Sequence, residues 1–108
     1  MTTDTPVLDT IVDITAASID HSSMSVRDFV LVRLAALIAV DAPPASYLAN
    51  APAVQEVGLT AEDVQGVMVA IAPVVGTPKV VSAAGQILRA LGFVIAVGDA
   101  EAAGPADV

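Results

Sequence analysis

The amino-acid sequence predicts an all-α protein, and three observations point to this fold class. Apolar residues recur at spacings of three and four along most of the chain, as they do on one face of an amphipathic helix. Residues typical of helix ends, mainly Ser, Thr, Gly and Pro, separate these segments. No segment alternates apolar and polar residues in the manner of a half-buried strand. We therefore expect a compact bundle of about five to six helices.

The first expected helix covers residues 6–19. Val7, Ile11 and Ile14 would line one of its faces, while most of the Asp residues of this segment lie on another face. Residues 21–24 follow as a short polar linker. The segment therefore has the pattern of an amphipathic helix.

A second helix is expected from Ser25 to about Val40. The Ser25 hydroxyl can accept a hydrogen bond from an early backbone N–H, and Asp28 three residues later completes a weaker form of the capping box. The interior of the segment is apolar nearly all round apart from Arg33, which is typical of a helix contacted on several sides. Its Ala-rich composition and its lack of alternation favour a helix over a strand.

Prolines and glycines divide the next part of the chain into short helices. Residues 41–44 end the second helix, because proline suits the first turn of a helix but not its interior. We expect short helices over residues 45–49 and 50–57, the second with Asn50 as its N-cap. Gly58 then supplies the left-handed residue that ends this segment.

Two longer helices are expected in the second half of the chain. Thr60 caps the first, which runs to about Val75, and Pro73 should bend its last turn. Residues 76–78 combine a C-cap glycine, an N-cap threonine and an N1 proline, and they are the strongest helix boundary in the chain. The final helix is expected over residues 79–97.

The composition predicts one domain that associates with copies of itself. We expect residues 1–97 to form a single helical domain and residues 98–108 to form a flexible acidic tail. Hydrophobic residues make up 56% of the chain and charged residues 15%, against about 45–50% and about 25% in typical soluble domains. A small domain cannot bury this surplus in its own core. A homo-oligomer follows, with residues 29–40 and 67–97 as candidates for its interface.

Several classes of protein are disfavoured by the composition. No apolar run approaches the length of a membrane span, and the N-terminus has no secretory signal pattern, so we expect a cytoplasmic protein. The net charge of −8, with four Lys and Arg in total, disfavours nucleic acid as a partner. The absence of cysteine excludes disulfides, thiolate metal sites and thiol redox chemistry. His21, the only histidine, is more typical of a solvated surface residue, and we expect no metal and no cofactor.

Three stretches of sequence, in order and at consistent spacing, resemble a known family. Residues 26–30 followed by 34–40 are similar to an Arg-Glu-Leu opening to an alanine-rich helix. Residues 56–64 are similar to the motif Gly-(Leu/Val)-Thr-x-Glu-Glu-Ile, and residues 70–78 to the turn Ala-Pro-Tyr-Val-Gly-Phe-Pro. On these stretches, residues 25–91 resemble the carboxymuconolactone decarboxylase-like superfamily, which includes alkyl hydroperoxidase D.

The resemblance implies an alkyl hydroperoxidase D-like helical protomer that assembles into trimers or hexamers. In the redox branch of the family, a Cys-x-x-Cys pair precedes a histidine by four residues. The corresponding positions in this chain are Pro43, Ser46 and Asn50, so we expect no thiol peroxidase activity. The decarboxylase branch usually keeps the histidine, and its loss here speaks against lactone decarboxylation as well.

Four residues are candidates for a catalytic site, and Asp28 and Arg33 are the charged pair among them. Asp28 takes the place of an early glutamate of the family, and its alternative roles are a helix cap or a partner for Arg27. Arg33 is expected to pair with Asp28 or with an acid of a neighbouring subunit. An anion site for a carboxylate substrate is the other role open to Arg33.

Tyr47 and Asn50 are the two uncharged candidates. A pocket formed by Tyr47, Asn50 and apolar residues such as Met68 and Ile71 would hold a small apolar molecule. Asn50 as a helix cap is the alternative to a binding role.

Two functions remain open on the sequence alone. The first is a non-redox helical oligomer that acts as a binding or assembly module, with a protein or small molecule as its partner. The second is a decarboxylase or isomerase that acts on a small acidic or lactone substrate. A shell or cargo-type role, in which the acidic tail engages a partner, rests on the composition of residues 98–108 alone.

Overall fold

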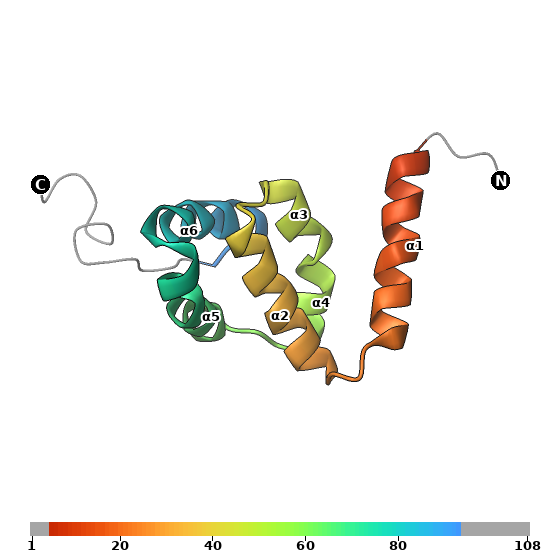
Figure 1. Ribbon diagram of the computed structural model, residues 1–108, viewed down its shortest axis with the longest axis horizontal. Coiled ribbons are helices and arrows are strands. Elements are labelled where there is room, and N and C mark those ends of the chain that lie inside the picture. The colour runs from red at the N-terminus through yellow and green to blue at the C-terminus, as the bar shows by residue number, and fades with distance from the viewer. Residues whose placement is uncertain (1–4, 94–108) are drawn as a thin grey trace, which may run out of the picture.

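A computed structural model describes residues 5–93 of the chain, and this part consists of helices with no strand. The predicted all-α class is therefore confirmed. Figure 1 shows how the helices are arranged. In chain order they are α1 (Pro6–His21), α2 (Val26–Ala39), α3 (Pro44–Ala49), α4 (Ala51–Glu56), α5 (Ala61–Val75) and α6 (Thr77–Leu91).

The main core lies where α2, α3, α5 and α6 pack against one another. α2 contributes a stripe with one residue per turn, Val30, Leu34 and Ile38, each 4% exposed or less. The buried residues of the main core are Leu34, Ile38, Ala42, Tyr47, Val64, Met68, Ala83 and Ile87. A smaller cluster of Val30, Val54 and Leu59 joins α2 to α4 and the turn that follows it. The opposite side of α2 remains open, since Val32 is 53% exposed.

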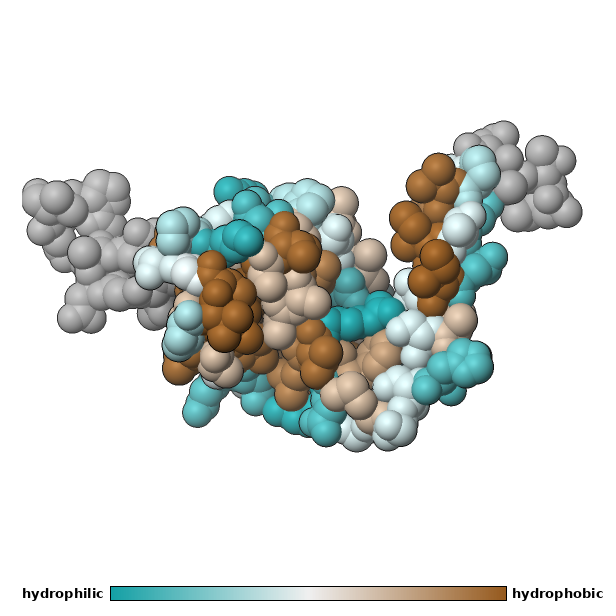
Figure 2. All heavy atoms as spheres, viewed as in Figure 1, coloured by the Kyte–Doolittle hydropathy of each residue, from teal (hydrophilic) through white to brown (hydrophobic). Residues whose placement is uncertain are grey.

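Helix α1 stands apart from this bundle (Figure 1) and buries no residue. Its large apolar side chains are all more than half exposed, and they are Val7, Leu8, Ile11, Val12, Ile14 and Ile19. Figure 2 shows them gathered on the side of α1 that faces the bundle, across a hollow. The amphipathic pattern of this segment is thus real, but its apolar face has no cover within the described residues.

Local capping interactions begin the longer helices α2 and α5, as the sequence predicts. The Ser25 hydroxyl accepts a hydrogen bond from the backbone N–H of Asp28 at 3.1 Å. Thr60 and Asp63 form a complete capping box, with the Asp63 N–H donating to Thr60 Oγ1 at 3.2 Å and the Thr60 N–H to Asp63 Oδ2 at 2.9 Å. Gly58 has φ +69°, in the left-handed region predicted for it.

Two predicted helix boundaries are wrong. α1 continues through His21, which lies in its last turn and not in the linker. The last helix ends at Leu91 because Gly92 adopts the left-handed conformation, with φ +77°, whereas we expected it to reach residue 97. Residues 94–97 and the predicted tail at 98–108 lie outside the described residues.

Two predicted N-caps are also wrong. Thr77 is the first residue of α6 and Gly76 is its N-cap, with no side-chain cap bond. Gly76 has φ +91°, so one glycine ends α5 and starts α6. Asn50 precedes α4 without capping it, because its side chain instead donates back to the Ser46 carbonyl at 2.8 Å, at the end of α3.

Candidate functional site

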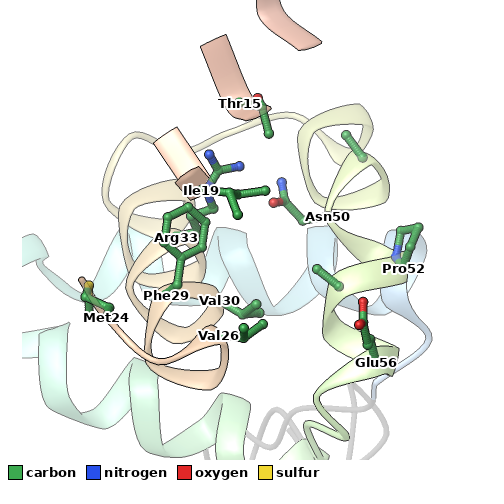
Figure 3. Close-up of a pocket in the computed structure, with 12 residues that line it drawn as sticks. Thr15, Ile19, Met24, Val26, Phe29, Val30, Arg33, Asn50, Pro52 and Glu56 are labelled. Atoms are coloured by element: carbon green, nitrogen blue, oxygen red, sulfur yellow. The ribbon is translucent and has the colours of Figure 1, made fainter. Parts of the chain in front are cut away.

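A groove of about 460 Å³ lies between α1 and the wall made by α2, the end of α3 and α4. Figure 3 shows its lining side chains. Helix α1 contributes Thr15 and Ile19, and the turn after α1 contributes Met24. The remaining lining residues come from α2 and from the α3–α4 region, and they are Val26, Phe29, Val30, Arg33, Ala49, Asn50, Pro52, Ala53 and Glu56. Most of this surface is apolar, with a few polar groups.

Arg33 supplies the positive charge of the groove. Its guanidinium lies over the Phe29 ring, 4.6 Å from the ring centre, in a cation–π contact. No carboxylate among residues 5–93 forms an ion pair with it. The expected pairing with Asp28 is not formed, because these residues are five apart on α2, whereas Phe29 lies four residues before Arg33 on the same face.

Asn50 and Glu56 are the other polar residues that line the groove beside Arg33 and Thr15. Asn50 is half-buried, and its amide nitrogen is held by the Ser46 carbonyl. Figure 3 shows Arg33 and Asn50 directed into the same space, with Glu56 at the other end. Two of the four candidate residues thus share one groove.

Tyr47 does not share this groove with Asn50. Its side chain is 0% exposed and lies in the main core with Met68, while Ile71 packs against that core. The phenol hydroxyl has no hydrogen-bond partner among the described residues. Burial, and secondarily the carboxylate of Asp41, raise the pKa of Tyr47 to about 12. The structure therefore separates the pair that we expected to line one pocket.

Asp28 and Arg27 also lie outside the groove lining. Asp28 is exposed in the first turn of α2, where its backbone N–H donates to the Ser25 hydroxyl. Arg27 pairs with Asp63 of α5 at 2.8 Å rather than with Asp28. The pKa of Asp63 is lowered, first by the Thr60 backbone N–H and further by Arg27. This ion pair joins α2 to α5 on the surface.

Arg33 and Asn50 are the two groove residues that were candidates on the sequence; Phe29, Glu56 and Ile19 are among those that were not. Phe29 lies four residues before Arg33, and this spacing was a signal for the cation–π contact. No comparable signal identified Glu56 or Ile19, because their position depends on how α4 and α1 are placed around α2.

The described part of the chain holds no group of three or more side chains suited to binding a metal ion. Within residues 5–93, no helix has the length and apolar character needed to cross a membrane.

No family model, no curated protein and no solved structure matches this chain. The resemblance of residues 25–91 to the carboxymuconolactone decarboxylase-like superfamily thus rests on the three sequence stretches that carry it.

Proposed function

We propose that this chain is a divergent member of the carboxymuconolactone decarboxylase-like superfamily. It acts as a non-redox helical oligomer that serves as a binding or assembly module. The observation that supports this proposal most is the uncovered apolar face of α1, which buries no residue within the described chain.

The apolar face of α1 makes a lone protomer unfavourable. Its exposed fractions include 74% for Val7, 54% for Ile11 and 63% for Ile14. A contiguous exposed apolar surface of this kind is typical of an interaction site. A helix of 16 residues is also marginal in water when no tertiary contact supports it. Association with another surface would cover the apolar face of α1 and, at the same time, stabilise the helix.

The residues at the family's redox positions support a role without thiol chemistry. The chain has no cysteine, and Pro43, Ser46 and Asn50 stand where the Cys-x-x-Cys pair and the histidine would lie. Asn50 is held by the Ser46 carbonyl, so this part of the chain forms a local hydrogen bond. An amide and a hydroxyl cannot perform disulfide exchange, and an amide cannot shuttle a proton near neutral pH.

The mass of the chain in solution tests the proposal. We expect an oligomer, a trimer or hexamer on the family pattern, in light scattering or sedimentation equilibrium at micromolar concentration. A well-folded monomer at that concentration, with the far-ultraviolet signal of a helical protein, would overturn the proposal because it would leave the α1 face in water.

A second candidate function is a decarboxylase or isomerase acting on a small acidic or lactone substrate. Arg33 and Asn50 favour it, because both line a groove whose volume of about 460 Å³ is typical of small-molecule sites. A guanidinium can bind a carboxylate through two parallel hydrogen bonds. Glu56 is the one carboxylate of this lining that can transfer a proton.

Benzoate binding distinguishes this second candidate from the first. An enzyme of this kind should bind benzoate in calorimetric titration, and Arg33→Gln should weaken the binding at least tenfold. Arg27→Gln is the matched control, since Arg27 pairs with Asp63 away from the groove. Equal binding by both variants, or none by the natural chain, would count against a carboxylate site.

A further inference from the structure

The uncovered face of α1 and the groove beside it belong to one surface. We propose that a second copy of this chain covers it, with the two α1 helices forming a reciprocal antiparallel pair. Each α1 then lies along the open side of this groove, between α1 and the α2–α4 wall of the other copy. This inference rests on the proposed oligomeric function and names its interface.

The two sides of α1 have opposite character. At about 100° per residue, Ile11, Thr15 and Ile19 share one side of α1, and Thr15 and Ile19 of this side line the groove. By the same spacing, Asp13 and Asp20 lie on the opposite side. α1 therefore presents an apolar front toward an open groove and an acidic back toward solvent.

An occupant of the groove has to suit two different walls. One wall is the apolar front of α1, and the other carries Arg33 and Asn50 among apolar side chains (Figure 3). A helix with an apolar front and an acidic back meets both walls when its front packs on α1 and its back approaches Arg33. α1 of a second copy is such a helix, since it carries three Asp residues and no Lys or Arg.

Charge complementarity favours this occupant. Arg33 has no carboxylate partner among residues 5–93 and is held by the Phe29 ring alone. A carboxylate from the partner's α1 would supply the charge that the chain itself does not place there. Asp13 lies near the middle of α1, so an antiparallel pair brings it toward the centre of the opposing groove.

The available area also fits a pair. The six large apolar side chains of α1 are each more than half exposed. They offer on the order of 400 Å² of apolar surface, at roughly 100 Å² for a fully exposed side chain. A stable interface buries about 800 Å² on each partner. In a reciprocal pair each copy buries both its α1 front and its groove wall. The summed area of these two surfaces approaches the area that a stable interface buries on each partner.

Symmetry gives the proposal a specific consequence. The same patch is used on both copies, so the contact is closed by a twofold axis and leaves no further α1 face open. The oligomer in solution should then contain an even number of copies of the chain, as a dimer or as a hexamer built from three pairs. A trimer would overturn the paired arrangement while leaving the proposed oligomeric function intact.

A matched pair of variants tests the interface. Ile11→Asp places a charge on the apolar front of α1, and Val69→Asp places the same charge on an exposed valine of α5, a helix that does not line the groove. In light scattering of the full chain we expect Ile11→Asp to reduce the mass at least twofold and Val69→Asp to leave it unchanged. The near-ultraviolet signal of Tyr47, which lies in the core, checks that the bundle of each variant remains folded.

The remaining outcomes are distinct. An oligomer that keeps its mass in Ile11→Asp with a folded bundle would overturn the α1 pair and leave oligomerisation through another face. A monomeric natural chain would overturn both proposals. Because the chain has no cysteine, Ile14→Cys, near the middle of α1 on its apolar side, gives an independent readout: oxidation should yield a covalent dimer, and Asp13→Cys should yield none. The reverse result would contradict the orientation of α1 in the pair.

Discussion

Tyr47 places a phenol hydroxyl inside the core without a hydrogen-bond partner among the described residues. Desolvating a hydroxyl without compensation is unfavourable, and ionising it there is more unfavourable still. Burial, with a further contribution from the Asp41 carboxylate, therefore raises the pKa of Tyr47 to about 12. The aromatic ring stabilises the core through its apolar contacts while the hydroxyl opposes that effect.

The raised pKa predicts a loss of stability at alkaline pH. The folded chain keeps the Tyr47 proton between pH 10.0 and about 12, where the unfolded chain releases it. The contribution of protonated Tyr47 to the free energy of unfolding is therefore fully present below pH 10.0, and it is lost as the pH rises toward about 12. The full loss is about 3 kcal/mol for two pKa units, measured by urea unfolding across this range.

Tyr47→Phe is the control for the alkaline experiment. It should be at least as stable as the natural chain below pH 10.0, because it removes a buried hydroxyl that has no partner within residues 5–93. It should also lose this part of the alkaline pH dependence. Tyr47 is the only tyrosine, so tyrosinate absorbance reports its ionisation directly. Ionisation near pH 10.0 in the folded chain would contradict its burial.

At the scale of the helices, the turn between α2 and α3 depends on a distant hydrogen bond. Asp41 has φ +54°, in the left-handed region that residues other than glycine rarely adopt. The Ser82 hydroxyl of α6 donates to Asp41 Oδ1 at 2.7 Å. This bond links the turn to α6, so the unusual backbone is supported by a contact from a segment far along the chain.

Two glycines of the α5 region should respond in opposite ways to replacement by alanine. Gly66 lies within α5, and a methyl group at this position would meet no other side chain. Gly66→Ala should therefore stabilise the chain by about 0.5–1 kcal/mol. Gly76 has φ +91° between α5 and α6, so Gly76→Ala should destabilise it by about 1–3 kcal/mol. Thermal or urea unfolding measures both.

The sign of the difference between these two variants is the decisive observation. Both substitutions add one methyl group to the same part of the chain, so general effects of added apolar surface cancel between them. Equal effects in both variants would mean that the backbone conformation of Gly76 does not constrain the α5–α6 junction.

For the whole molecule, α1 is the helix that the described residues support least. It has no buried residue, whereas α2 carries three in one stripe. In the oligomer that we propose, association supplies the energetic support of α1, and association depends on concentration. The proposal therefore makes the stability of the protein a property of the oligomer and not of the protomer alone.

A concentration-dependent melting temperature follows from this arrangement. Each tenfold rise in protein concentration should raise the melting temperature by about 3 °C, because mass action favours the associated folded state. Differential scanning fluorimetry with an external dye, or calorimetry, measures the shift. In Ile11→Asp the melting temperature should be independent of concentration, and an equal shift in that variant would place the association elsewhere.

The sequence alone determined where α2 and α5 begin and that Gly58 ends the segment before α5. These features depend on interactions a few residues apart, such as the bond between Ser25 and the Asp28 N–H and the capping box of Thr60 and Asp63. The left-handed conformation of Gly58 is equally local. Predictions failed where two local options competed, as for Asn50, whose side chain bonds back to Ser46.

The tertiary structure decided which of the apolar faces are covered. From the sequence, α1, α2 and α6 all require burial, and the interface was expected in residues 29–40 and 67–97. Burial depends on how segments far apart in the chain meet, so only the folded arrangement shows that α2 is built into the core while the front of α1 remains open. For the same reason it separates Tyr47 from Asn50 and places Arg33 beside Asn50 in the groove.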